Sequence, residues 1–546
     1  MPGLVSTRRR VLVAAALGAI VAVAVVVRVW KLRWGLRSGM AFTDELQLWT
    51  SYLTAFVPLR PQSFLREDSP AALLYPAFYG ILSGLATAGA HAIGLIPAPR
   101  TDILSAIYVA RLVSATASLL NVLLIGLLGW RIGSARTGLF AAALAAVVPV
   151  EAMQVHYASV DPLLGACVTL TLLLACELVL RASSWTALAA GGAAGLAFGA
   201  KYTGLIVFGS CGWALLEVCL RERSLRPLVR MLPVAVVGFV AMLLVACPPC
   251  VLQSSFMFRA ISGLSSISST AYLRFWDVQL LPTLGWYGKP YLYQLFAGLP
   301  FGLGWPLYFA AIAGVVSLAR HARAVDRVLL VTLGVYFVSV GMTFVVEATR
   351  YYIPMVPILM VATARMLDGL SSSRLRAALF AGIWIYTAAF TLSQVERYSF
   401  NQQMEVANFV RRTVPAPAAG RIRVAYPQGL DAYYGLRQPI IWAGLTPVAA
   451  PSGRWLEERP EAFVIPELTA VRLKRDAPDG VDAQALARIE RGETEYRPVR
   501  SWRSHYLQSD LYTTLDPVFV GDYAQGEIGF TVYLRGDLAA GREARP

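Results

Sequence analysis

The chain of 546 residues contains few charged residues and few histidines. Charged residues make up 15% of the sequence and histidine occurs four times, whereas 57% of the residues are hydrophobic. Soluble domains carry about 25% charged residues and interrupt their apolar runs more often. This composition excludes an ordinary soluble protein. It indicates a polytopic α-helical membrane protein, because several apolar runs approach the roughly 20 residues that cross a bilayer.

Sequence motifs for nucleotide hydrolysis and metal catalysis are also missing. The chain has no Walker A sequence, no HExxH, no GxSxG and no DxD of the kind that holds a metal on a nucleotide sugar. These absences argue against ATP-driven transport and zinc-dependent hydrolysis. The sequence therefore indicates no metal site and no cofactor, and a divalent metal stays optional.

Cysteine is scarce as well, with six residues in the chain. Four of them lie within apolar runs, where cysteine packs as a small hydrophobic residue. Cys247 and Cys250 have CxxC spacing, but no second CxxC or nearby histidine completes a metal site. Simple packing is the favoured interpretation of this pair, and a disulfide on the non-cytoplasmic side is the alternative.

Positive charge is abundant, with a formal net charge of +15. The arginines occupy short loops between apolar runs, a distribution that sets membrane topology rather than one that binds nucleic acid. Arg8, Arg9 and Arg10 precede an apolar run at 11–30 that lacks a small-x-small cleavage site. We expect an uncleaved first span with a cytoplasmic N-terminus.

We predict eleven transmembrane spans, at 11–30, 105–130, 137–150, 161–181, 186–200, 203–220, 229–248, 291–318, 328–346, 351–367 and 375–394. The segment 71–95 is also apolar. If it crossed the bilayer, the later arginine clusters would lie outside, against the positive-inside rule. We therefore expect 71–95 to form an in-plane helix at the outer interface, within a large first outer loop at 31–104.

The polar C-terminal region follows the last span and differs from it in composition. The segments 422–426, 439–442, 462–465 and 529–533 are short, β-branched or aromatic, and flanked by turn residues, as is typical of strands. A helix is predicted at 401–412. The sequence thus predicts a transmembrane domain at 1–395, with outer loops at 31–104 and 249–290, and a small extracytoplasmic α/β domain at 396–546.

Two adjacent carboxylates, Asp44 and Glu45, follow the first span and precede an aromatic-rich amphipathic stretch. One interpretation is structural, with Thr43 or Asp44 capping a helix and Glu45 in its first turn. The other is catalytic, because a carboxylate at a membrane interface can have a raised pKa that suits a general base.

Two other predicted outer segments contain ionisable residues. Asp161, which precedes Pro162, either caps the next span or contributes to a site together with His156. Lys201 lies between two apolar runs, where an isolated lysine is costly unless it reaches the interface or a partner.

Further cations lie among aromatic residues. Arg350, beside Tyr351, is either an interfacial anchor or an anion-binding group. Arg259, Arg274 and Lys289 belong to the loop at 249–290 and have the charge that a phosphate headgroup requires. The candidate catalytic residues are Asp44 and Glu45. The candidate substrate-binding residues are Asp161, His156, Lys201, Arg350, Tyr351, Arg259, Arg274 and Lys289.

Six motifs occur in order along residues 11–395. They are Phe42-Thr-Asp-Glu45, Ser69-Pro-Ala-Ala-Leu-Leu-Tyr75, Ala110-Arg-Leu-Val-Ser114, His156-Tyr-Ala-Ser-Val-Asp-Pro162, Gly195-Leu-Ala-Phe-Gly-Ala-Lys-Tyr-Thr-Gly204 and Arg350-Tyr-Tyr-Ile-Pro-Met-Val-Pro357. Together they resemble the bacterial branch of the protein O-mannosyltransferase and aminoarabinose-transferase superfamily, whose members are GT-C glycosyltransferases.

This resemblance implies an inverting transfer of a sugar from a polyprenyl-phosphate donor to an acceptor hydroxyl of a glycan, lipid or protein. The reaction is implied to occur on the non-cytoplasmic face of a bacterial plasma membrane. Carried over by motif, Asp44 is the catalytic base, Glu45 and Asp161 shape the sugar and acceptor site, and Lys201 and Arg350 are candidates for the phosphate. No metal is required, because the departing phosphate is already a stable anion, unlike the leaving group of a glycosidase.

The chain departs from this superfamily at one place. Many relatives have His or Lys before the proline of the second motif, where this chain has Ser69. Arg66, Arg259 or Lys289 is expected to supply the missing cation. Two other functions stay open: a lipid or solute transporter, which predicts ionisable groups deep in the spans, and a noncatalytic scaffold that binds through 396–546.

Overall fold

The fold was analysed in a computed structural model of the full chain. The structure describes residues 7–36, 50–60, 62, 75–253, 291–292, 294–320, 322–341, 349–396, 402–415, 421–427, 436–451, 454–455, 457, 459–476, 479–502 and 529–539. These residues fall into two compact units, a helical unit that extends to residue 392 and a C-terminal unit from residue 393 onward that also takes in the short segment 33–36.

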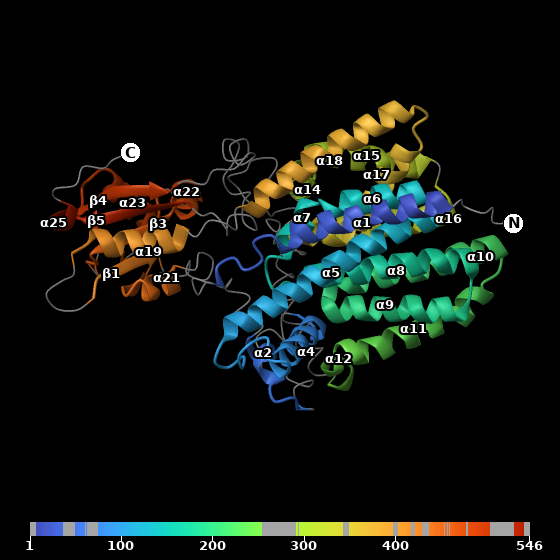
Figure 1. The fold of residues 1–546 in the computed structure, drawn as a ribbon, viewed down its shortest axis with the longest axis horizontal. Helices are drawn as coiled ribbons and strands as arrows, with labels where there is room; N and C mark the ends of the chain where they lie inside the picture. Colours follow the sequence, from blue (N-terminus) through green and yellow to red (C-terminus); the bar gives the residue numbers. More distant parts are fainter. Residues whose placement is uncertain are drawn as a thin grey trace. The chain divides into compact units, whose positions relative to one another are not determined.

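The helical unit is built almost entirely of α-helices (Figure 1). Its elements are α1 (Thr7–Val29), α2 (Thr50–Ala55), α4 (Phe78–Ala92), α5 (Ile103–Ile132), α6 (Ala135–Ala146), α7 (Pro149–Gln154), α8 (Asp161–Arg181), α9 (Ser184–Ala200), η4 (Tyr202–Gly204), α10 (Leu205–Glu222), α11 (Arg226–Ala246), α12 (Pro248–Leu252), η6 (Gln294–Gly298), α14 (Leu299–Leu303), α15 (Trp305–Arg320), α16 (Ala324–Gly341), η7 (Thr349–Met355), α17 (Val356–Asp368) and α18 (Ser373–Glu396).

Six described helices are long and apolar enough to cross a bilayer, and a bent pair formed by η6–α14 and α15 would make a seventh. The six are α1, α5, α8, α10 (from Tyr202), α11 and α18. The polytopic helical fold is therefore confirmed, whereas the number of eleven spans stays a prediction. Helix α4, predicted not to cross, has 15 residues and is not among these candidate spans.

Ion pairs join the helices at one end of the bundle, which we call the arginine end. These pairs are Arg131–Glu177 (2.5 Å), Arg136–Asp368, Arg323–Asp326 (3.0 Å), Arg327–Glu217 (2.5 Å) and Arg365–Asp326. They connect α5, α6, α8, α10, α16 and α17. The five arginines of these pairs thus lie at one end of the bundle, each beside a carboxylate.

Successive long helices run between the arginine end and the opposite end in alternating directions. Helix α8, for example, runs from Asp161 to the arginine end, and α9 returns to Lys201. The first helix follows the same rule, because Val13 lines the same groove as Trp130 near the arginine end, while His156 at the other end hydrogen-bonds the Trp30 carbonyl. The described residues of the site proposed below, Asp161, Lys201 and the segment around Arg350, lie at the opposite end.

Helices α9 and α11 pack backbone to backbone along a stripe of glycines at 191, 195 and 199. A Cβ atom on Gly191 would lie 1.9 Å from the Ala235 carbonyl oxygen, and one on Gly199 would lie 2.4 Å from the Ala246 Cβ. Only glycine permits this separation, as in the small-residue interfaces of membrane helices. The stripe fixes Lys201, which directly follows α9, relative to the end of α11.

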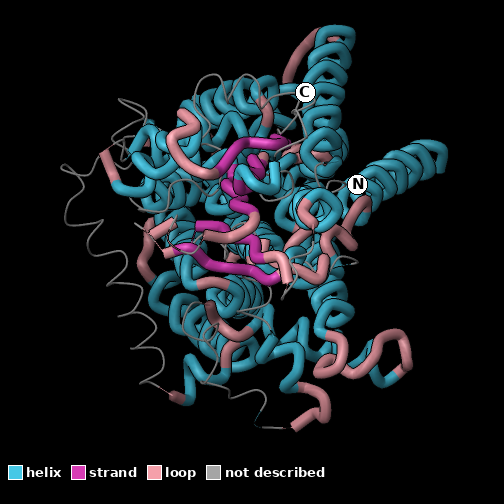
Figure 2. Tube along the Cα trace, turned by 90° about the vertical axis from the view of Figure 1, so that its left-hand side faces the viewer, coloured by secondary structure: helices cyan, strands magenta, loops and turns pink. Residues whose placement is uncertain are grey.

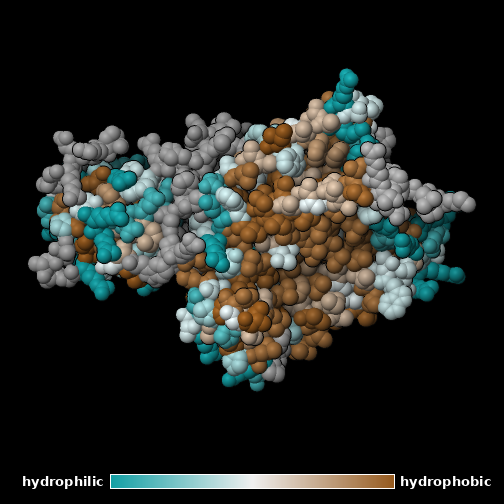
Figure 3. Space-filling view, in the orientation of Figure 1, coloured by the Kyte–Doolittle hydropathy of each residue, from teal (hydrophilic) through white to brown (hydrophobic). Residues whose placement is uncertain are grey.

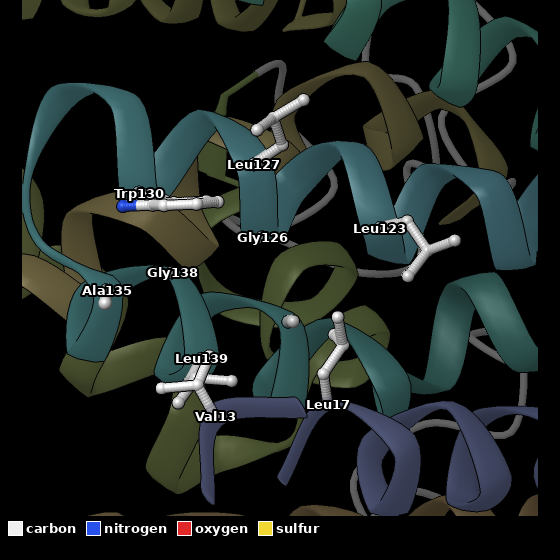
Figure 4. Close-up of a pocket in the computed structure, with 10 residues that line it drawn as sticks. Val13, Leu17, Leu123, Gly126, Leu127, Trp130, Ala135, Gly138 and Leu139 are labelled. Carbon is white, nitrogen blue, oxygen red and sulfur yellow. The ribbon is translucent and has the colours of Figure 1, made fainter. Parts of the chain in front are cut away.

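The outer surface of the helical unit is largely apolar. Figure 3 shows hydrophobic side chains over most of its visible face, and Val237, Phe309 and Ile385 are each at least 60% exposed. Such an extensive exposed apolar surface is expected of a protein surrounded by lipid. A groove of about 260 Å³ lies between α1, α5 and α6 and is lined by apolar side chains, including Leu17 and the exposed Trp130 (Figure 4).

The C-terminal unit is a small α/β fold, as predicted. Its elements are α19 (Gln402–Thr413), β1 (Arg423–Pro427), α21 (Arg437–Trp442), β2 (Thr446–Ala450), β3 (Ala462–Pro466), α22 (Glu467–Asp476), α23 (Val481–Glu490), β4 (Tyr496–Trp502), β5 (Phe530–Arg535) and α25 (Gly536–Ala539). The five strands, magenta in Figure 2, form one sheet in the order β2-β1-β3-β5-β4. Strand β1 is parallel to β2 and β3, and β5 is antiparallel to β3 and β4.

The core of this unit lies between the sheet and helices α22 and α23. Phe463, fully buried on β3, packs against Trp455 and Tyr496 with ring centroids 5.5 and 6.5 Å apart. Leu486 and Ile489 of α23 complete the same cluster. Strand β3 is buried along its whole length, so both of its faces are covered.

Three of the four predicted strands and the predicted helix at 401–412 are confirmed, but the prediction for 439–442 was wrong. These residues belong to helix α21, which ends before Gly444, whose φ of +77° turns the chain into β2. Strands β2 and β4 were missed. Each occupies an edge of the sheet and contains a proline, Pro447 or Pro498, which edge strands tolerate but which weakens the strand pattern in the sequence.

Candidate active site

An ion pair between Lys201 and Asp161 lies at the centre of the candidate site. The Lys201 Nζ donates to Asp161 Oδ1 at 2.7 Å, and the two side chains are only 7% and 3% exposed. The Ser159 hydroxyl donates to the other carboxylate oxygen at 3.2 Å. A buried pair of this kind is costly to desolvate and is retained only with good geometry and further hydrogen bonds.

Aromatic side chains and a second cation surround this pair. The Lys201 ammonium lies over the ring of Tyr351, 4.6 Å from its centroid, and 5.7 Å from that of Tyr75. Arg350 stacks on the same Tyr351 ring, with its guanidinium carbon 6.0 Å from the centroid. Two cations and one carboxylate thus lie around two tyrosines, and these five residues come from four segments that are distant in the sequence.

Electrostatics keep Lys201 charged in this buried place. Burial alone would lower the pKa of Lys201, but the Asp161 carboxylate, with smaller contributions from Tyr75 and Tyr351, raises it overall. Burial also raises the pKa of Tyr75, although Lys201 and Arg350 act in the opposite direction. The site therefore presents an ammonium group and a neutral phenol at neutral pH.

Local structure positions these groups. Asp161 begins α8, and Pro162 follows in the first turn. Proline suits this position because a backbone N–H there would have no acceptor within the helix. The Asp161 carboxylate does not cap the helix, as one interpretation of the sequence had it, but turns to Lys201. Lys201 is in an extended conformation between α9 and η4, so its side chain leaves the helix axis and reaches α8.

A second buried network lies beside the first turns of α8. Glu151, 1% exposed, accepts hydrogen bonds from Ser118 Oγ and Asn121 Nδ2, both at 2.6 Å. Arg28 of α1 is completely buried, and its Nε donates to Ser118 Oγ at 2.8 Å. The guanidinium also donates to the Ala146 carbonyl at 2.8 Å. This network links α1, α5, α6 and α7, and inside the bundle the negative charge of Glu151 balances the positive charge of Arg28.

This second network reaches the first through Gly165. A Cβ atom at that position would lie 3.3 Å from Glu151 Oε1 and 2.8 Å from a methyl group of Ile353, next to the Arg350 turn. Sequence reasoning did not single out Arg28 or Glu151. The available signal was an arginine inside the first apolar run, since ionisable residues within a span generally have a partner or a function.

His156 and Arg111 hold the chain that leaves the first span. Both ring nitrogens of His156 lie against backbone carbonyls: Nε2 is 2.7 Å from the Trp30 oxygen and Nδ1 is 2.8 Å from the Ala152 oxygen. Arg111 Nη1 donates to the Leu32 carbonyl at 3.1 Å. The predicted role of His156 in substrate binding stays a prediction; in this structure its ring nitrogens face the two backbone carbonyls.

The remaining predicted site residues cannot be placed. Asp44, Glu45, Arg259, Arg274 and Lys289 lie outside the described residues. Of the predicted residues that the structure does describe, Asp161, Lys201, Arg350 and Tyr351 come together, and Tyr75 joins them. Within the described part of the chain, no three His, Cys, Asp or Glu side chains are arranged to hold a metal ion.

Comparison with known proteins agrees with this architecture. The profile of the family described as dolichyl-phosphate-mannose-protein mannosyltransferase matches residues 103–251, which run from α5 to α12 and include Asp161 and Lys201. A search of curated proteins gave no match.

Solved structures of two glycosyltransferases share the fold. ArnT from Cupriavidus metallidurans in the apo state is 15% identical, with a TM-score of 0.51, and the match covers 97% of this chain and 99% of that one. The archaeal oligosaccharyltransferase AglB from Archaeoglobus fulgidus, in complex with an inhibitory peptide and a dolichol-phosphate, is 13% identical, with a TM-score of 0.50. That match covers 91% of this chain and 74% of AglB. The family profile, which matches about a quarter of the chain, and the shared fold together indicate a membrane glycosyltransferase of the GT-C fold, similar to the protein O-mannosyltransferase and aminoarabinose-transferase superfamily.

Proposed function

We propose that the protein transfers a sugar from a polyprenyl-phosphate donor to an acceptor hydroxyl, with inversion, on the non-cytoplasmic face of a bacterial plasma membrane. The observation that carries this proposal is the buried Lys201–Asp161 pair beside Arg350, Tyr351 and Tyr75. It lies at the end of the bundle opposite the paired arginines. The dolichol-phosphate bound to AglB, which shares the fold, supports a lipid-phosphate donor.

The cations are assigned to the donor phosphate. Arg350 is the better candidate for direct contact, because a guanidinium can bind two phosphate oxygens at once and this one is only partly buried. Lys201 is deeper and holds Asp161, so it supports the positive potential of the site and orients that carboxylate. Arg259, Arg274 and Lys289 are additional candidates from the loop at 249–290.

Asp44 is assigned as the general base. In the proposed reaction the acceptor oxygen attacks the anomeric carbon from the face opposite the phosphate, Asp44 takes the hydroxyl proton, and the bond from the anomeric carbon to the phosphate oxygen breaks. The lipid phosphate leaves as an anion that the nearby cations stabilise. Glu45 and Asp161 orient the sugar and the acceptor. The leaving phosphate needs no second acid to protonate it, so the reaction does not require the paired carboxylates of a glycosidase.

Membrane sidedness follows from charge. Arginines concentrate at one end of the bundle, which the positive-inside rule assigns to the cytoplasm. Helix α18 begins at that end, where Arg376 donates to the Leu370 carbonyl at 2.9 Å, and is long enough to cross. We therefore assign the region at 396–546 to the non-cytoplasmic side as a separate domain that takes part in acceptor choice.

The proposal is tested by transfer in proteoliposomes, with lipid-linked sugars extracted from the host membrane as donors and isotope labelling of the sugar as the readout. Asp44→Asn should abolish transfer while binding of undecaprenyl phosphate is retained. Asp102→Asn is the matched control, because Asp102 is a carboxylate whose Oδ1 caps α5 by accepting from Ser105 N at 3.1 Å, a role that asparagine also fills. Near-normal transfer by Asp44→Asn, or solute flux without transfer by the unaltered protein, would refute the assignment.

A further inference from the structure

Cys247 and Cys250 lie at the end of α11 that is opposite the arginine end. Cys247 directly follows α11, and Cys250 lies one turn further along, in α12. Both side chains are buried, with exposures of 0% and 3%. The other four cysteines lie within the long helices α8 and α10. The function proposed above uses none of the six.

The backbone already brings these two cysteines to disulfide distance. The Cys250 N–H donates to the Cys247 carbonyl at 3.0 Å, which closes a four-residue turn around Pro248 and Pro249. Such a turn places its first and last Cα atoms less than about 7 Å apart, within the range that a disulfide spans. The two thiols also hydrogen-bond each other, so their side chains point together.

The surroundings of the pair connect it to the candidate site. The backbone of Ala77, two residues after Tyr75, hydrogen-bonds the Cys247 sulfur. Both thiols lie within electrostatic range of Tyr202, the residue after Lys201. On the helix side, the contact between Gly199 and Ala246 fixes the residues just before Lys201 and Cys247 against each other.

We infer that Cys247 and Cys250 form a disulfide in the mature protein. This disulfide covalently fixes the turn that follows α11, next to the segments that carry Tyr75 and Lys201. The inference rests on the orientation proposed above, which places the pair in the oxidising compartment.

The oxidant is the disulfide of an exported thiol oxidoreductase. The Cys247 thiolate attacks this disulfide and forms a mixed disulfide, and the Cys250 thiolate then displaces the oxidoreductase. The two cysteines lose two protons and two electrons, and the oxidoreductase becomes a dithiol.

The thiol–disulfide exchange must occur before Cys247 and Cys250 are buried, because the folded chain covers both sulfur atoms. Once formed, the bond is sheltered from soluble thiols for the same reason. The loop that it closes is short, so its effect on global stability through chain entropy is small. Its expected effect is local, at the junction of α11, Ala77 and Tyr202.

The test is a count of free thiols on the full-length protein. Cells are lysed directly into denaturant with N-ethylmaleimide, and the labelled protein is analysed by mass spectrometry before and after reduction. We expect four labels without reductant, on Cys167, Cys176, Cys211 and Cys219, and six after reduction. These four residues are an internal control for complete unfolding. Six labels without reductant would overturn the inference.

Single substitutions distinguish an internal disulfide from one made to another molecule. In Cys247→Ser and in Cys250→Ser, all five remaining cysteines should be labelled without reductant. A cysteine that stays blocked in either variant would overturn the pairing. Because the thiol count does not use sugar transfer, its failure is separate from failure of the proposed reaction. A reporter fused after residue 396 then tells whether six labels reflect a reversed orientation or the absence of the bond.

Discussion

The Lys201–Asp161 pair allows the structural and chemical roles of a buried charge to be separated. Lys201→Met keeps the length and much of the volume of the side chain but leaves the Asp161 carboxylate buried without its cation. Removal of one partner from a buried pair costs about 3–5 kcal/mol. Loss of the cation–π contacts with Tyr351 and Tyr75 adds about 0.5–2 kcal/mol, so we expect a large fall in thermal stability.

The double variant Lys201→Met/Asp161→Leu removes both charges. Replacement of a buried pair by apolar residues is often neutral or even stabilising by about 1–4 kcal/mol. We therefore expect the double variant to recover most of the stability that Lys201→Met loses. Transfer should not recover, because the positive potential near the donor phosphate and the orienting carboxylate are both gone.

The assay compares thermal inactivation in detergent with transfer by the monodisperse fraction of each variant. Recovery of both stability and transfer in the double variant would show that the pair is only structural. An unchanged stability of Lys201→Met would show that Asp161 is not buried with Lys201 as its partner.

The pH dependence of the same pair has a defined sign. The pKa of Lys201 is raised in the folded protein, so its contribution is fully present below the ordinary lysine pKa of about 10.4 and is lost only as the pH rises through the higher folded pKa. We expect no lysine titration in the stability of the unaltered protein between about pH 6 and 9. A steep decline across that interval would contradict the assigned charge state.

Three further predictions concern packing. Gly191→Ala should destabilise the helical unit by at least about 1–3 kcal/mol because its Cβ would overlap the Ala235 carbonyl, whereas Gly209→Ala, with nothing within 4 Å, should be neutral or stabilising in the same thermal-inactivation measurement. Arg28→Met should lower the inactivation temperature markedly, because the buried Glu151 network loses its cation at a cost of about 3–5 kcal/mol; an unchanged temperature would contradict this account. Phe463→Ala should cost about 3–5 kcal/mol in the C-terminal unit and be seen as faster proteolysis between 423 and 535 of the full-length chain.

The fold class could be predicted because its signals are long and redundant. Apolar runs long enough to span a membrane, separated by arginines, repeat along the helical unit. A wrong assignment of one segment therefore does not change the predicted fold class. The strands of the C-terminal unit carry weaker signals. Pro439 to Trp442 combines β-branched and aromatic residues, yet these residues form helix α21, and both positions beside β1 are occupied by β2 and β3.

The candidate site was predictable as a set of residues but not as a set of contacts. Asp161, Lys201 and Arg350 were each recognisable as isolated charges next to apolar runs. That Lys201 binds Asp161 depends on α8 and α9 lying side by side, which no local pattern specifies. Arg28 was hidden for the same reason, since its partners come from α5 and from the ends of α6 and α7.

The glycine stripe on α9 limits how residue 201 can be repositioned. Because an α-helix turns by about 100° per residue, insertion or deletion of one residue between Gly199 and Lys201 would rotate the lysine away from Asp161, while the stripe keeps the rest of α9 locked on α11. A change of one residue within the stripe would instead move glycines off the contact and bring Cβ atoms onto it. Changes in donor or acceptor preference, whether by evolution or by engineering, are therefore expected in the loops that face this lysine and not in the helix that carries it.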